Sequence, residues 1–326
     1  MSEYRFLLHI GANKTGTSSI QRMLFENREA LAAAGWEYPD FHLLYMAHHR
    51  VAYSLSRHPG QGLEGDWMAE FRALTADPAK RYIVSSELFF RTVDPRATAQ
   101  LFPPGQTRIV LYLRDHLGYM MSWYAQAVQE RNLTACLTDY VRLFSQSFSS
   151  YLATWDEVYG RDHVIVRDFH RDRLTGGDAR LDFLAWIDGL DPATMVLPGE
   201  ESNLSISGNL LFFKKILNNY MTYDEAASAP IPDEFGAFAA VKDSFSGRFR
   251  ITEDEAQIVR TLFRDDLRAL QARGVELTAP SGRLGGHPSP DFDTLRDDVK
   301  LIKEVAERTG KRFLLYADRW QDWHSL

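Results

Sequence analysis

The chain has 326 residues, of which 45% are hydrophobic and 25% charged, and its formal net charge is −7 at pH 7. These values exclude wholesale disorder and collagen-like structure, and the negative balance gives no general footprint for nucleic-acid binding. Cys136 is the only cysteine, which excludes an intrachain disulfide and a cysteine-rich zinc site. Because residues 1–5 lack a signal-peptide pattern and no run approaches about 18 apolar residues, we expect a cytoplasmic protein without a transmembrane segment.

The first predicted unit is a strand, a glycine-containing turn and a helix. An apolar strand is expected over residues 4–10, and helical spacing of apolar residues runs from 17 to about 34. Ser18 with Gln21 offers a capping box at the start of this helix, and Gly35 can close it. The turn between this strand and this helix therefore predicts an anion site, since backbone N–H groups converge there at a helix N-terminus.

The lysine of this turn is not where a nucleotide P-loop has it. The spacing from Gly11 to Gly16 is that of a P-loop, but the position directly after the second glycine is Thr17, and the nearby lysine is Lys14, inside the loop. This displacement argues against an ordinary ATPase or GTPase. It indicates that the loop holds a different phosphate ester.

Further along the chain, short β-type runs alternate with helical patterns. The expected strands are 82–86, 108–113 and 164–166, and the expected helical segments are 117–128, 137–158, 207–220, 253–272 and 293–307. This order favours a single α/β domain over 1–326, in which a P-loop-like parallel sheet flanked by helices occupies 1–190 and a mainly helical extension without clear strands occupies 191–326. The glycine- and proline-containing segments 59–65 and 280–290 are predicted surface loops, either of which could border a substrate entrance.

A second segment with anion-binding chemistry surrounds the strand at 108–113. Arg114 stands at the end of this strand, and Ser122 falls in the second turn of the helix that follows. The arginine fork suits phosphate oxygens, and a nearby hydroxyl can complete the site. An arginine and a serine eight residues apart mean little alone, but together with the unusual loop at Lys14 they become specific.

Together the two segments resemble the sulfotransferases that use 3′-phosphoadenosine 5′-phosphosulfate (PAPS). The loop Lys14-Thr15-Gly16-Thr17 is similar to that of bacterial sulfotransferase-domain proteins, and the likeness covers roughly the first 220 residues. It implies in-line transfer of a sulfuryl group from PAPS to an acceptor hydroxyl or amine, without a metal.

The same resemblance implies roles for individual residues. Lys14 would be the catalytic cation, and donors to the 5′-phosphate would come from Thr15, Gly16, Thr17 and Ser18. Arg114 and Ser122 would hold the 3′-phosphate. A fixed cation and oriented N–H groups at the breaking bond stabilise the transition state more than the ground state.

The general base is open between a carboxylate and a histidine. Glu87 follows the strand at 82–86, on the sheet edge where ligand-binding loops gather, and could accept the proton if burial raised its pKa. His48 and His49 are the competing pair, because an imidazole titrates near the working pH. Each also has a structural interpretation, as a helix cap, an ion-pair partner or a partly buried polar side chain.

Two other functions stay open from the sequence. A P-loop kinase would need a lysine at Thr17 and a carboxylate for Mg²⁺ at a strand end, which Asp115 meets only weakly. A noncatalytic nucleotide-binding protein of the same fold is the other alternative. The sequence leaves the acceptor class undetermined, with a carbohydrate or another hydroxyl compound as examples, and does not determine the oligomeric state.

Overall fold

The computed structural model describes residues 4–56, 62–143, 146–199, 205–227, 231–280 and 286–321. The chain forms two compact units. The sheet unit comprises Met1–Asp115, Gln146–Glu200 and Arg264–Thr278, and the helical unit comprises His116–Ser145, Glu201–Phe263 and Ala279–Leu326. This division does not fall at residue 190, because each unit is assembled from separate stretches of the chain. That residues 1–326 act as a single domain stays a prediction.

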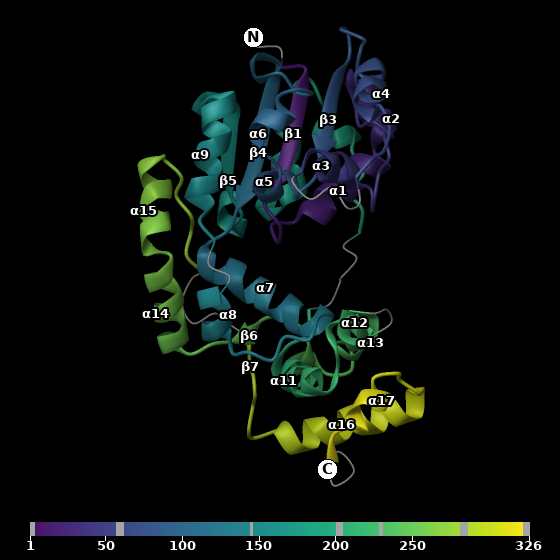
Figure 1. Ribbon diagram of the computed structural model, residues 1–326, viewed down its shortest axis with the longest axis vertical. Coiled ribbons are helices and arrows are strands. Elements are labelled where there is room, and N and C mark those ends of the chain that lie inside the picture. The colour runs from purple at the N-terminus through teal and green to yellow at the C-terminus, as the bar shows by residue number, and fades with distance from the viewer. Residues whose placement is uncertain are drawn as a thin grey trace. The chain divides into compact units, whose positions relative to one another are not determined.

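The sheet unit is built on a five-stranded parallel sheet of order β2-β3-β1-β4-β5 (Figure 1). The strands are β1 (Phe6–Gly11), β2 (Trp36–Glu37), β3 (Arg81–Ser85), β4 (Thr107–Leu113) and β5 (Val164–Asp168). The predicted strands are confirmed to within one or two residues, and β2 is an addition at the sheet edge. Since all strands are parallel, the loops that follow β1 and β3 leave from the same edge of the sheet.

Helices flank this sheet, as predicted for the fold class. They are α1 (Thr17–Glu26), α2 (Arg28–Ala33), α3 (His49–Leu55), α4 (Trp67–Leu74), α5 (Phe89–Thr92), α6 (Pro95–Thr98), α9 (Phe148–Tyr159), α10 (Ala179–Leu184) and α15 (Arg264–Ala272). In Figure 1, α9 lies beside β5 and α15 lies beside α9, in agreement with their contacts.

The two faces of the sheet bury different side chains because alternate strand residues point to opposite sides. Leu7 and Val110 pack with Ile20 of α1 and Phe183 of α10 in one buried cluster. On the opposite face Phe6 meets the ring of Phe102 edge-on at a centroid distance of 5.4 Å. Buried side chains therefore cover both faces of the sheet, whereas the loops leave from the edge at the carboxyl ends of the strands.

The predicted helix over 17–34 is wrong in one respect, because it is interrupted at Asn27. The side chain of Asn27 donates to the carbonyl of Met23 and to that of Val196, each at 2.8 Å, and accepts from the N–H of Val196 at 2.7 Å. This residue joins α1 to a segment far along the chain and separates it from α2. Gly35 closes α2 as predicted, with a left-handed φ of 78° and its N–H bonded to Ala32.

The helical unit consists mainly of helices packed on one another. These are α7 (His116–Glu130), α8 (Leu137–Leu143), α11 (Gly208–Leu217), α12 (Tyr223–Ala227), α13 (Ile231–Phe238), α14 (Glu253–Leu262), α16 (Leu295–Thr309) and α17 (Leu314–Ala317). The part after residue 190 is mainly helical, as predicted, and its strands are one short parallel pair among the described residues, β6 (Phe249–Arg250) and β7 (His287–Pro288). None of the helices in the described ranges combines the length and the apolarity that a membrane span requires.

Candidate functional site

The loop that leaves β1 packs directly against the segment that follows β3. Gly11, the last residue of β1, has a φ of +113°, and a Cβ atom placed on it would lie 3.0 Å from the Cα of Glu87. A side chain at this position would push the two segments apart. Glycine therefore brings the predicted anion loop and the predicted base together.

The second glycine of the loop starts α1. Gly16 has left-handed φ and ψ of 74° and 17°, and no side chain in the described residues forms a cap hydrogen bond at this helix end. The predicted capping box is wrong, because Gln21 uses its amide to donate to Oε2 of Glu87 at 2.8 Å. The first backbone N–H groups of α1 are thus not satisfied by a side-chain cap, which suits an anion.

Lys14 occupies a backbone conformation that non-glycine residues rarely adopt. Its φ is 65°, and its side chain is partly exposed. A left-handed non-glycine residue costs about 1–2 kcal/mol, and such strain gathers at functional sites. The structure thus places the displaced lysine at a strained point of the loop, and its catalytic role stays a prediction.

The hydroxyl groups of the loop have different surroundings. Thr15 is buried, and its Oγ1 donates to the carbonyl of Ala12 at 2.6 Å, so this hydroxyl stabilises the turn. Thr17 is buried at the start of α1, while Ser18 is exposed. Of these three hydroxyls, that of Ser18 is the one open to a ligand, and the other two residues would contribute backbone N–H groups.

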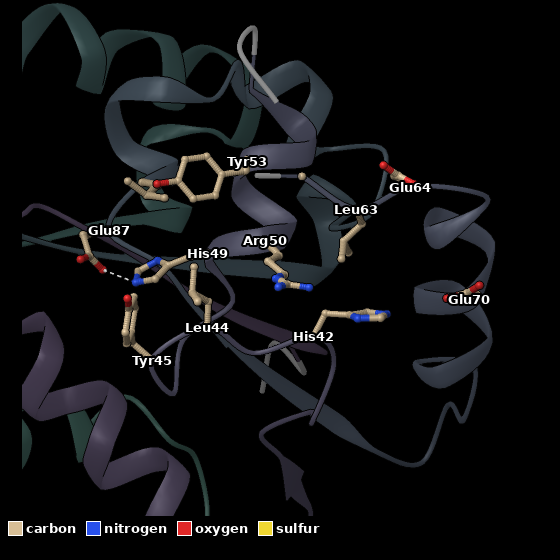
Figure 2. A pocket seen from close by; sticks show the side chains of 12 residues that line it. His42, Leu44, Tyr45, His49, Arg50, Tyr53, Leu63, Glu64, Glu70 and Glu87 are labelled. Carbon is tan, nitrogen blue, oxygen red and sulfur yellow. Dashed lines mark ion pairs between the residues drawn. The ribbon is translucent and has the colours of Figure 1, made fainter. Parts of the chain in front are cut away.

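Glu87 lies beside His49 at the carboxyl end of β3 (Figure 2). The Oε2 atom of Glu87 is 3.9 Å from Nε2 of His49, and the two side chains are 17% and 12% exposed. On its other side His49 shares a hydrogen bond of 2.8 Å between Nδ1 and Oγ of Ser86. Burial lowers the pKa of His49, and the neighbouring carboxylate of Glu87 acts in the opposite direction.

The gap between these two atoms fits a hydroxyl group. An oxygen placed at hydrogen-bond distance, about 2.7–2.9 Å, from both Nε2 and Oε2 completes a triangle on the 3.9 Å separation. One oxygen atom could therefore contact both Glu87 and His49, two residues that the sequence left as alternatives for the general base.

His48, the other predicted histidine, is engaged inside the fold. Its Nδ1 accepts from the N–H of Ser85 at 3.2 Å, and its Nε2 is 3.0 Å from the carbonyl of Pro39. It is fully buried, and burial lowers its pKa to about 4. With both ring nitrogens used, His48 has no atom for a substrate proton, and the catalytic role expected for it has no support in this geometry.

The predicted 3′-phosphate pair is divided between the two units. Arg114 is half-buried in the sheet unit, directly after β4, and Ser122 lies on α7 in the helical unit. Each residue occupies the element that the sequence predicts. Their joint action on one phosphate stays a prediction.

A cavity of about 1010 Å³ opens beside Glu87 within the sheet unit (Figure 2). The sequence identified Glu87 and His49 but not most of the other lining residues. The described lining consists of His42, Leu44, Tyr45, His49, Arg50, Tyr53, Gly62, Leu63, Glu64, Glu70, Glu87 and Leu88. The predicted loop 59–65 borders this cavity through residues 62–64. Its residues 59–61, and residues 281–285 of the other predicted loop, lie outside the described ranges, and an entrance role for either loop stays a prediction.

The arrangement of metal-ligating residue types in the described part of the chain bears on whether a metal ion can bind. No group of three or more histidine, cysteine, aspartate or glutamate side chains there is arranged to hold a metal ion. The candidate site comprises a strained lysine, a helix N-terminus and a carboxylate–imidazole pair on an α/β fold with a P-loop-like first unit.

Comparison with known proteins finds likeness in fold alone. No protein-family model matches the chain, and no curated protein matches it in sequence. A sulfotransferase from Alicyclobacillus acidocaldarius aligns with a TM-score of 0.43 and 14% identity over 85% of this chain and 98% of its own. Retinol dehydratase, in complex with androsterone and the inactive cofactor PAP, aligns with a TM-score of 0.34 and 13% identity over 86% of this chain and 84% of its own. At these identities and TM-scores neither likeness bears on what this chain binds or on its reaction.

Proposed function

We propose that this chain is a sulfotransferase that transfers the sulfuryl group of PAPS to an acceptor hydroxyl or amine. The observation that carries the proposal is the strained Lys14 in a loop that ends at the N-terminus of α1, with Glu87 packed against the start of this loop and its carboxylate hydrogen-bonded to α1. Glu87 contacts Gly11 at one end of the loop and accepts from Gln21 of α1 at the other. The proposed anion site and the proposed proton acceptor are thereby adjacent.

The donor would bind with its 5′-phosphosulfate in the loop. Backbone N–H groups of Thr15, Gly16 and Thr17 and the exposed hydroxyl of Ser18 are suited to the phosphate oxygens. Arg114, at the carboxyl end of the neighbouring strand β4, would recognise the 3′-phosphate, and Ser122 is its predicted partner.

The reaction would proceed by in-line displacement. The acceptor oxygen forms a bond to sulfur while the bond between sulfur and the bridging oxygen breaks, and adenosine 3′,5′-bisphosphate (PAP) leaves. Negative charge grows on the bridging oxygen, and the Lys14 ammonium would stabilise it. Such a preorganised donor is typically worth about 10²–10³ in turnover.

The acceptor proton would pass to Glu87. The carboxylate is held by the amide of Gln21 on one side and faces His49 on the other, so its oxygen is fixed near the position of an acceptor hydroxyl. His49 would position the same hydroxyl through Nε2. For a neutral alcohol the base then carries the proton while the sulfate ester forms.

Calorimetry with the full chain tests the donor site. Binding of PAP, AMP and ATP is measured without metal and then with Mg²⁺, and we expect PAP to bind at least tenfold more tightly than AMP without metal. The Arg114→Ala variant should lose that preference, because it lacks the guanidinium that recognises the extra phosphate. Preference for ATP with Mg²⁺ would instead favour a kinase, and selective PAP binding without turnover on any acceptor would favour a noncatalytic nucleotide-binding protein.

A further inference from the structure

The cavity beside Glu87, here named the acceptor cavity, has a lining that discriminates between kinds of acceptor. It is formed by the loop at 42–45, one side of α3, residues 62–64 and Glu70 of α4, all in the sheet unit. Its volume of about 1010 Å³ is at the upper end for sites that hold a compact organic molecule. An acceptor larger than a single small alcohol therefore fits there.

The lining is mainly polar. Half of its twelve described residues carry an imidazole, a guanidinium or a carboxylate, and two more are tyrosines. In the described part of the chain no hydrogen bond or ion pair engages the side chains of Arg50, Glu64 or Glu70. An apolar ring system placed there would remove these groups from water without giving them partners, at about 1–3 kcal/mol for each group that becomes buried.

The charge of the lining is negative. Glu64, Glu70 and Glu87 contribute three carboxylates against the single guanidinium of Arg50. Figure 2 shows Glu87 and His49 at one end of the view and Glu64 and Glu70 at the other. An acceptor that spans the cavity from the reacting hydroxyl meets carboxylates at both ends, so an anionic acceptor is repelled.

An exposed aromatic ring completes the lining. Tyr45 is 81% exposed and has a left-handed φ of 51°, as do His42 and Met46 beside it at 47° and 66°. The loop is held by paired backbone hydrogen bonds between Leu44 and Ala47, of 2.9 and 3.1 Å. A strained loop that presents a flat ring beside carboxylates and a guanidinium provides the stacking surface and the hydrogen-bonding groups that a polyhydroxylated ring requires.

We propose that the acceptor cavity binds a carbohydrate that carries no negative charge. This inference rests on the proposed function for the reaction, but the recognition follows from the lining alone. Neutral and amino sugars satisfy the free polar groups and stack on Tyr45, whereas uronic or sulfated sugars meet Glu64 and Glu70, and apolar alcohols leave the polar groups unpaired.

A glycan array probed with the full chain in the presence of PAP tests this inference. The array presents neutral, amino, uronic and sulfated oligosaccharides, and transfer from labelled PAPS is then measured on the bound glycans and on a set of apolar alcohols. We expect binding and transfer on neutral or amino glycans and at least tenfold weaker binding of anionic ones.

A charge variant provides the matched test. Glu64→Gln with Glu70→Gln should reduce the discrimination against anionic glycans at least threefold, while Glu29→Gln, an exposed glutamate on α2 outside the lining, should leave it unchanged. If both variants discriminate like the wild type, the role of these carboxylates is refuted.

The outcomes separate this inference from the proposed function. Three outcomes would overturn the carbohydrate inference and leave the sulfotransferase proposal standing. They are preferential binding of anionic glycans, transfer only to apolar alcohols, and binding of no glycan by a chain that binds PAP selectively. Failure to bind PAP would overturn the proposed function, and the glycan binding measured without PAP then decides the inference alone.

Discussion

The sheet unit and the helical unit place backbone strain and buried charge differently. All four described non-glycine residues with left-handed φ are in the sheet unit: Lys14, His42, Tyr45 and Met46. They occur on two loops, one proposed for the donor and one for the acceptor. Because such strain persists only where the surrounding structure enforces it, this difference agrees with the placement of the proposed donor loop and the acceptor cavity in the sheet unit.

The two units also bury different ionisable groups. In the sheet unit His9 and His48 are fully buried, and burial lowers their pKa values to about 3 and about 4. In the helical unit Lys214 is buried, and burial lowers its pKa to about 7. Its Nζ donates to the carbonyl of Arg131 at 3.1 Å and to the side chain of Asn218. Buried ionisable groups alone therefore do not distinguish the proposed site from structural packing.

The largest expected effect is that of removing the strained lysine. Lys14→Ala should lower turnover with PAPS by at least about 100-fold, because the charge on the leaving oxygen loses its cation. The free energy of unfolding should change by less than about 1 kcal/mol, since Lys14 is partly exposed. PAP release in the presence of an acceptor and chemical denaturation measure the two quantities.

Lys80→Ala is the control for this change. Lys80 is an exposed lysine of the same unit, paired with Glu37 at 2.7 Å, and its removal should leave turnover unchanged. A Lys14→Ala variant that folds normally and retains wild-type turnover would remove Lys14 from the mechanism.

The buried groups predict a different pH dependence for each unit. Below pH 6.5 the histidines of the unfolded chain bind protons, whereas buried His9 and His48 of the folded sheet unit stay neutral down to about pH 4. The free energy of unfolding should therefore fall as pH decreases from 6.5 to 4, by about 1.4 kcal/mol per pH unit for each histidine. Lys214 acts in a higher window: the unfolded lysine is protonated up to about pH 10.5 and the folded one only up to about 7, so stability of the helical unit should rise between these values.

Hydrogen exchange, followed by mass spectrometry of peptides from each unit and corrected for the intrinsic pH dependence of exchange, measures both slopes. His48→Asn should reduce the loss of stability of the sheet unit below pH 6.5. Lys214→Met should remove the rise in stability of the helical unit between about pH 7 and 10.5. If either variant keeps the wild-type slope in its own unit, burial of that group does not control the stability there.

The smallest expected effect compares a left-handed glycine in each unit. Gly16→Ala and Gly310→Ala should each lower the free energy of unfolding by about 1 kcal/mol, since their φ values are 74° and 61°. At Gly16 the new Cβ would also approach the ring of Phe169 to 3.0 Å, whereas nothing lies within 4 Å of it at Gly310. Only Gly16→Ala should weaken PAP binding in calorimetry, and equal effects of the two variants on binding would contradict a donor site at α1.

Much of the sheet unit was predictable because its strands are buried apolar runs separated by glycine-containing turns. The break at Asn27 was not, since the helical spacing continues through it and its cause is a contact with Val196. The capping box failed for a similar reason: Ser18 and Gln21 have the right local spacing, but Gln21 is drawn to Glu87. Local patterns could not anticipate interactions formed by distant segments.

The candidate site was predictable to the extent that its residues lie next to strands. Lys14 and Glu87 lie within three residues of the ends of β1 and β3, and a parallel sheet brings both to one edge. Arg50, Glu64 and Glu70 belong to no motif, and only the folding of separate segments around one cavity shows that they line the same space. The choice between His48 and His49 likewise required the partners of each ring nitrogen.

The hydrogen bond from Gln21 to Glu87 connects the two halves of the proposed reaction. Gln21 lies in the first turns of α1, where the donor would bind, and its amide fixes the carboxylate that would meet the acceptor. If donor binding orders this end of the helix, it also orders the base, and the acceptor then binds a site already in its productive arrangement. Thermodynamic reciprocity requires the converse, so each substrate would tighten the binding of the other by the same factor.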